Sequence, residues 1–145
     1  MNVLYPAIFK YDRTGKRYAV HFPDLSEAIT EGETLEEALF NASEVLTLTL
    51  EGRIEEGMEI PKPSQRKNAK LIAPSARAQA ALLMRWAKGE HTTAEIARAL
   101  NTSWPAIARL EDPHHWPNLR QLERAAAAIG QRLVISLEPV SSEIK

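Results

Sequence analysis

The local pattern of the sequence changes at Ser75, and this change constrains the fold more than any other feature. Before Ser75, short runs of β-branched and aromatic residues alternate with turn-forming groups and one helical segment. After Ser75, the pattern is that of helices separated by short breaks. Strands followed by a run of helices predict an α+β chain. We therefore expect one domain at residues 1–74 and a second at residues 75–145.

The first half is expected to form a β-β-β-α-β unit in which the helix covers one face of a small sheet. Its composition predicts strands at residues 3–12, 16–23, 27–32 and 69–74. Thr34 followed by Glu37 is a capping box, and apolar residues at helical spacing after it predict a helix that runs to about Glu51. Gly52 opens a turn-rich exit, and residues 64–70 are the expected linker between the domains.

The second half is expected to be all-α except for a terminal strand. Capping residues and breaks predict helices at residues 75–88, 92–100, 103–112 and 118–129. The composition of residues 132–137, "RLVISL", is that of a strand. Because such a strand would expose an apolar edge, a second subunit could pair with it.

The third of these helices begins with a tryptophan and a proline, which indicates where the helix starts. A proline in the first turn removes an N–H that has no intrahelical partner, whereas one turn later it would break the helix. With Ser103 as the N-cap, Trp104 and Pro105 take the first two helical positions. Trp104, Pro105, Ala106 and Arg109 are then expected to face away from the core.

Residues 92–112, followed by residues 118–137, resemble the helix-turn-helix of the XRE-like phage-repressor class. In that class the second helix of the pair lies in the DNA major groove, and its N-terminal residues contact base edges. The resemblance implies that Thr93 contacts a phosphate. The complete set of expected DNA-binding residues is Thr93, Thr102, Ser103, Trp104, Pro105, Ala106 and Arg109. Among the base-facing residues, only Arg109 has the paired donors that recognise guanine, so specificity would also depend on DNA shape.

The charges of the chain are unevenly distributed, although its net charge is only −1. Up to Ser64 there are six Lys/Arg and twelve Asp/Glu, whereas from Gln65 onward there are twelve and seven. Residues 65–112 alone carry eight basic residues and four acidic ones. The basic part therefore suits a polyanion such as DNA, and the acidic part suits a basic protein.

The acidic half resembles the HicB antitoxin family. The shared pattern includes "YPAIFKYD" at residues 5–12, the Phe-Pro-Asp turn at residues 22–24, the turn at residues 30–32 that leads into Thr34, and the Ile60-Pro61 exit. The resemblance implies a partial ribonuclease-H-like fold with a DNA-binding tail. It also implies a partner, a HicA-type toxin that cleaves messenger RNA with a histidine. In this family the tail is either ribbon-helix-helix or helix-turn-helix, and this chain has the second kind.

The function expected from these resemblances is that of an antitoxin, not an enzyme. The chain would bind and neutralise the toxin, and would repress its own operon as a homodimer or higher homo-oligomer on a palindromic operator. A basic ribonuclease would attract surplus carboxylates. The expected toxin-facing acids are those in the turns around the third strand, namely Asp24, Glu27, Glu31 and Glu33.

We expect no metal, no cofactor and no membrane span, and a location in the bacterial cytoplasm. Ribonuclease-H chemistry needs several carboxylates around two metal ions, but Asp12 lies in a turn, and Glu36 and Glu37 favour the first turn of a helix. His114 and His115 are neighbours in a proline-flanked loop with no third ligand nearby, and the chain has no cysteine.

Two alternatives remain open from the sequence. The chain could be a nuclease with a residual metal site, which would cleave nucleic acid on its own in the presence of magnesium. It could also be a stand-alone helix-turn-helix regulator whose acidic domain senses a small ligand. The second alternative predicts no gene for a short, basic, histidine-containing protein beside this one.

Overall fold

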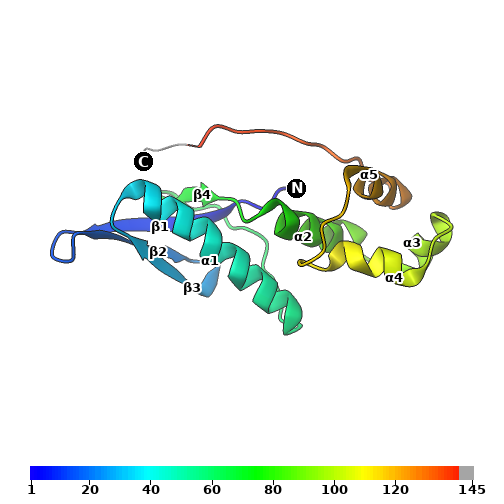
Figure 1. Ribbon diagram of the computed structural model, residues 1–145, viewed down its shortest axis with the longest axis horizontal. Coiled ribbons are helices and arrows are strands. Elements are labelled where there is room, and N and C mark those ends of the chain that lie inside the picture. The colour runs from blue at the N-terminus through cyan, green and yellow to red at the C-terminus, as the bar shows by residue number, and fades with distance from the viewer. Residues whose placement is uncertain (141–145) are drawn as a thin grey trace. The chain divides into compact units, whose positions relative to one another are not determined.

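A computed structural model describes residues 1–140 and confirms the α+β class (Figure 1). In this part of the chain a four-stranded antiparallel sheet is accompanied by five α-helices and one short 3-10 helix. The described residues form two compact units, residues 2–75 and residues 76–138. Residues 141–145, the last five of the expected second domain, lie outside the described residues.

The sheet of the first unit has the strand order β3-β2-β1-β4, and every neighbouring pair is antiparallel. The strands are β1 (Tyr5–Asp12), β2 (Arg17–Phe22), β3 (Leu25–Gly32) and β4 (Lys70–Ile72). Ile8 on β1 lies opposite His21 on β2, which in turn lies opposite Ile29 on β3. The four strands predicted from composition are thus confirmed, with boundaries that differ by a few residues.

The helix α1 (Leu35–Glu55) lies across one face of this sheet (Figure 1). It begins where the sequence predicts, because the Thr34 side chain accepts a hydrogen bond of 3.1 Å from the Glu37 backbone N–H. The core between helix and sheet consists mainly of fully buried residues, including Tyr5, Phe22, Leu25, Leu46 and Leu50. The packing is closest at Gly32, where an added Cβ would lie 2.4 Å from the Ala38 backbone nitrogen.

The helix continues four residues beyond its predicted end and passes through Gly52. The Arg53 guanidinium donates to both carboxylate oxygens of Glu27 on β3, at 2.8 and 2.7 Å, and to the Glu59 carbonyl at 3.1 Å. These contacts tie the last turn of α1 to the sheet and to the loop that follows. A glycine within a helix lowers the stability of the helix by about 1 kcal/mol. The ion pair between Arg53 and Glu27 offsets this loss.

The expectation that residues 64–70 form an interdomain linker is wrong, because these residues lie inside the first unit. The Ser64 backbone N–H and hydroxyl both donate to the Asp24 carboxylate, at 2.9 and 2.7 Å. Lys70 already belongs to β4. The division between the two compact units comes later, after Ser75.

The second unit is a bundle of short helices: α2 (Ala76–Lys88), α3 (Thr93–Ala99), α4 (Trp104–Ala108), a 3-10 turn (Arg109–Glu111) and α5 (Leu119–Ala128). Its core is one cluster of buried side chains, which are Met84, Ile96, Ala97, Ile107, Leu110, Ala125 and Ile129. Gly89, Asn101 and Gly130 have positive φ angles just after α2, α3 and α5. These are the breaks that the sequence predicts.

The predicted strand at residues 132–137 is wrong. Residues 131–140 have no regular secondary structure, and Val134 and Leu137 are 77% and 99% exposed. A strand needs a neighbour to accept and donate its backbone hydrogen bonds, and the described part of the second unit contains no strand. A strand-like composition alone therefore does not produce a strand here.

We predict that Gly32→Ala destabilises the first unit by about 3 kcal/mol, because the new Cβ would overlap the backbone of α1. The matched control is Gly52→Ala, where nothing lies within 4 Å of an added Cβ and removal of a helical glycine should stabilise by about 0.5 to 1 kcal/mol. Hydrogen exchange at increasing urea, read in peptides from residues 2–75, measures both effects. Equal stability of the two variants would contradict the close approach of helix and strand.

Candidate functional site

The helix pair α3–α4 is joined by a short, fully hydrogen-bonded turn. The Asn101 N–H donates to the Arg98 carbonyl at 3.1 Å, and the Thr102 N–H donates to the Ala97 carbonyl at 2.9 Å. Asn101 has a φ of 51°, a conformation that asparagine adopts more readily than most residues. The Ser103 side chain then caps α4 by accepting from the Ala106 N–H at 3.3 Å. The turn therefore holds the start of α4 in one orientation.

The N-terminal end of α4 presents most of the predicted DNA-binding residues to solvent. Thr102, Ser103 and Pro105 are exposed, and Trp104 is 57% exposed. Trp104 and Pro105 occupy the first two helical positions, as predicted. An exposed tryptophan at a helix start leaves a large apolar and hydrogen-bonding surface available to a partner.

The other three predicted residues differ in exposure. Arg109 is exposed at the start of the 3-10 turn, whereas Ala106 and Thr93 are half-buried. Thr93 is the first residue of α3, and its hydroxyl lies 3.5 Å from the Lys88 ammonium. The structure thus places Arg109 and Trp104 on the solvent side of α4, while Ile107 beside them is buried in the core.

An ion pair that sequence reasoning missed fixes the 3-10 turn to α2. The Lys88 ammonium lies 2.9 Å from the Glu111 carboxylate, and both side chains are mostly buried. Arg85 also donates to the Glu111 backbone carbonyl at 3.3 Å. Glu111 lies 23 residues after Lys88 and 26 residues after Arg85, so no local sequence pattern could reveal these contacts. They fix the 3-10 turn that also contains Arg109.

The charge division noted at Ser64 does not coincide with the division into units. Residues 2–75 contain twelve acidic and nine basic residues, and residues 76–138 contain six and eight. Arg66, Lys67 and Lys70 belong to the acidic unit. The opposition between the units is therefore weaker than the sequence division indicates, although its sign is unchanged.

Each of the four acids predicted to face a toxin already has a partner within the first unit. Asp24 accepts two hydrogen bonds from Ser64, and Glu27 accepts two from Arg53. Glu31 and Glu33 both lie near Arg17, with N–O distances of 2.6 and 3.8 Å. Asp24 and Glu27 stabilise the fold of their own unit, whatever further contacts they make.

The Glu27–Arg53 pair perturbs the ionisation of both groups. The hydrogen bonds from Arg53 lower the pKa of Glu27 from its ordinary 4.5 to about 2, and those bonds raise the pKa of Arg53. In the same region burial raises the pKa of Tyr5, and the nearby Asp24 carboxylate adds to that effect. The Tyr5 hydroxyl donates to the Pro61 carbonyl at 2.6 Å.

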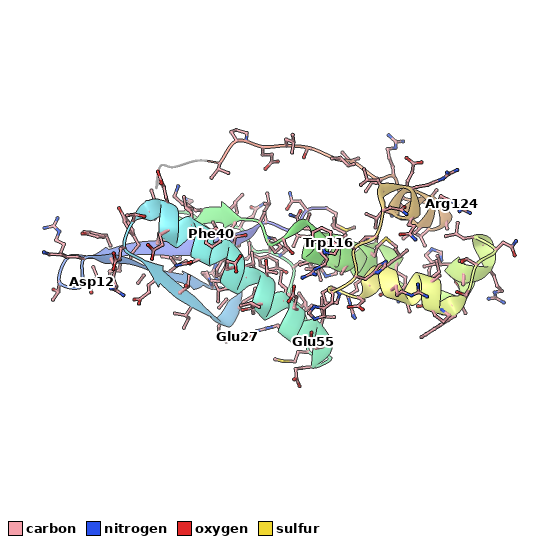
Figure 2. The ribbon with its side chains drawn as sticks, in the orientation of Figure 1. Asp12, Glu27, Phe40, Glu55, Trp116 and Arg124 are labelled. Atoms are coloured by element: carbon pink, nitrogen blue, oxygen red, sulfur yellow. The ribbon has the colours of Figure 1, made fainter. Side chains whose placement is uncertain are left out.

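Further exposed acids lie on α1 and at its C-cap, outside the set that the sequence predicts to face a toxin. Glu36, Glu37, Glu44 and Glu56 are exposed, and the described part of the chain offers their side chains no ion pair. Figure 2 labels Phe40 in the N-terminal half of the same helix and Glu55 in its last turn. The sequence does contain a signal for this surface, because Glu36, Glu44 and Glu56 are separated by multiples of four residues.

Within residues 1–140, no group of three or more His, Cys, Asp or Glu side chains could hold a metal ion. Asp12 acts as a turn residue, because its carboxylate accepts a hydrogen bond of 3.0 Å from the Thr14 N–H. No helix in this part of the chain is long and apolar enough to cross a membrane.

Comparisons with known proteins agree with the pattern of the first unit. Residues 4–73 match the model of the HicB-like antitoxins of bacterial toxin-antitoxin systems. The chain is also 36% identical to "Antitoxin HicB 2" of Photorhabdus laumondii over 133 residues, which cover 91% of this chain and 94% of that protein. The chain belongs to the HicB antitoxin family. "Antitoxin HicB" of Escherichia coli K12 is 31% identical over 80% of this chain and 86% of its own length.

The family assignment confirms the resemblance seen in the sequence and gives the class of function. This HicB-family chain is an antitoxin of a bacterial toxin-antitoxin system, and such a protein has a toxin as its partner. The matched relatives are named as antitoxins and not as enzymes, so membership of the HicB family requires no catalytic activity.

The pair Glu27–Arg53 predicts a specific response to acid. Since the folded-state pKa of Glu27 lies below 4.5, the pair stabilises the first unit above about pH 4.5 and loses this effect as the pH falls toward 2. A carboxyl NMR titration of the full chain should show Glu27 titrating near pH 2. In Arg53→Gln the pKa of Glu27 should be higher, because the largest cause of its lowering is removed. Unchanged titration in that variant would contradict the assigned cause.

Proposed function

We propose that the chain neutralises a HicA-type ribonuclease toxin with its first unit and represses its own operon with its second. The observation that carries the DNA-binding part is the exposed start of α4, held by the Ser103 cap on one side and the Lys88–Glu111 ion pair on the other. A recognition helix contacts base edges with its N-terminal residues. The exposure of this end of α4 and the contacts around it support that role.

The second unit is proposed to be a helix-turn-helix of the XRE-like class, with α3 as the first helix and α4 as the second. Arg109 would donate two hydrogen bonds to a guanine, and Trp104 and Ala106 would contact thymine methyl groups. Thr93, at the first turn of α3, would contact a phosphate. Thr102, Ser103 and Pro105 would complete the surface that faces the groove.

The first unit is proposed to be a partial ribonuclease-H-like fold that serves as a protein-binding module. The order β3-β2-β1-β4 with α1 on one face supports this assignment, together with the match of residues 4–73 to the HicB-like family. Asp12 is engaged in a turn, so it does not take the place of a mid-strand catalytic carboxylate. The toxin would be held by the acidic surface of this unit, since an RNA-cleaving protein needs a basic active site.

A homodimer or higher homo-oligomer is proposed as the form that binds the operator. One α4 helix reads only half of a palindromic site, and two-fold DNA sites are bound by two-fold proteins. Val134, Ile135 and Leu137 support self-association, because they are exposed apolar side chains close together in the chain.

We predict that Arg109→Ala weakens binding to the operon's own promoter about 10- to 100-fold, the value of one bidentate contact to guanine. The control is Arg120→Ala, which removes one exposed positive charge from the same unit and should cost much less. Gel-shift titration at fixed salt measures both. Co-purification with a HicA-type toxin should be unchanged in either variant.

Equal losses of DNA affinity in Arg109→Ala and Arg120→Ala would contradict the role of Arg109 in base recognition. Failure of the wild-type chain to retain a HicA-type toxin would contradict the toxin-binding half of the proposal.

A further inference from the structure

One row along α1 is mostly exposed and combines acidic with apolar side chains. Residues four apart are neighbours on a helix surface, and a row of them winds gradually about the helix axis. Here the row is Glu36, Phe40, Glu44, Leu48, Gly52 and Glu56. Phe40 is 66% exposed and Leu48 is 64% exposed, whereas Ala38, Ala42 and Leu46 of the same helix are fully buried against the sheet. We refer to these six positions as the α1 row.

The α1 row is interrupted by a shallow hollow at Gly52. The hollow measures about 340 Å³, and Leu48, Met58 and Glu56 are among the residues that line it. Gly52 creates this space, since nothing lies within 4 Å of the position that its Cβ would occupy. Arg53 also lines the hollow, but its charge is compensated by the two hydrogen bonds to Glu27.

The charge around the α1 row has one sign. Residues 18–61, which include β3 and α1, contain eleven acidic residues and a single Lys or Arg, the paired Arg53. The hairpin residues 10–17 contain four basic residues and one acid. The segment that contains α1 is therefore strongly negative, and the hairpin segment is positive.

The helix itself explains only part of the charge on α1. Glu36 and Glu37 lie in the first turn, where the helix dipole favours acids, but Glu55 and Glu56 lie at the C-terminal end, where the dipole disfavours them. Glu36, Glu44 and Glu56 lack ion pairs within the described chain, in contrast to Asp24, Glu27, Glu31 and Glu33. Acids without internal partners next to two exposed apolar side chains match the anatomy of a protein-binding surface.

We propose that the α1 row is the surface that docks the basic toxin, an inference that rests on the proposed function. Phe40 and Leu48 supply the apolar contact, and Glu36 and Glu44 beside them steer and pair with basic residues of the toxin. One lysine or arginine of the toxin enters the hollow at Gly52, with its methylene groups on Leu48 and Met58 and its charge at Glu56. The toxin-facing acids are thus those of α1 and not the four around β3.

The opposite face of the sheet provides a control. Ile29 is 65% exposed and alternates with the buried Ala28, so its side chain points away from α1. Glu27 and Glu31 lie two residues from Ile29 on the same strand, but each already forms an ion pair with an arginine of the first unit. Ile29 therefore has a fractional exposure similar to that of Phe40 and Leu48, but the acids beside it are engaged within the fold.

The test measures the affinity of full-length variants for the purified toxin. Phe40→Ala and Leu48→Ala should each weaken binding about 10- to 30-fold, as expected for anchors at the centre of an interface. Gly52→Gln should weaken binding similarly, because the glutamine side chain would fill the hollow. The unit should stay folded, because glutamine is a good helix former. Ile29→Thr should stay within about twofold of the wild type. Glu44→Lys should slow association, most strongly at low salt.

Three results would overturn the inference. Wild-type affinity in Phe40→Ala, Leu48→Ala and Gly52→Gln would show that the toxin docks elsewhere, while the proposed function would stand. A change in oligomeric state by light scattering, with toxin affinity unchanged, would show that the α1 row binds a second copy of this chain. Absence of toxin binding by the wild-type chain would overturn the proposed function itself.

Discussion

The packing of α1 on β3 determines the organisation of the first unit. At the start of the helix, Gly32 allows the strand to approach the backbone of Ala38. In the middle, small and apolar side chains such as Ala42 and Leu46 are fully buried. At the end, Arg53 binds Glu27 with two hydrogen bonds. Because these contacts fix the rotation of α1, they also determine which of its residues face solvent.

The second unit achieves rigidity with a different set of contacts. Its core is small, and its helices are short, so the orientation of α4 depends on the turn at Asn101, the cap at Ser103 and the buried Lys88–Glu111 pair. The two units have separate cores, so in the proposed function one unit binds protein and the other binds DNA. This division of labour follows from the proposed function and explains why the surface features of the units differ.

The sequence predicts the elements whose determinants are local. The Thr34 cap and the Ser103 cap each involve residues three apart, and both helix starts are where the sequence places them. Predictions fail where distant residues decide the outcome. The Glu27–Arg53 pair carries α1 through Gly52, and the Asp24–Ser64 contact draws the expected linker into the first unit.

Residues 132–137 fail as a strand for a related reason, because pairing depends on a neighbour that composition cannot supply.

For the candidate sites, the sequence identified the exposed start of α4 but could not tell paired from unpaired acids. Carboxylates look alike in a sequence, and only the structure shows that Asp24 and Glu27 are engaged within their own unit while Glu36 and Glu44 are not. The family, in contrast, was evident from the residues around the Phe-Pro-Asp turn and Thr34, and the comparisons confirm it.

The proposed neutralisation of a ribonuclease by binding can be measured as RNA cleavage by a purified HicA-type toxin, with the full-length chain added in increasing amounts. If the chain neutralises the toxin by binding it, cleavage should fall to the background level at a fixed molar ratio of the two proteins. Cleavage that continues at full rate in a large excess of the chain would contradict it.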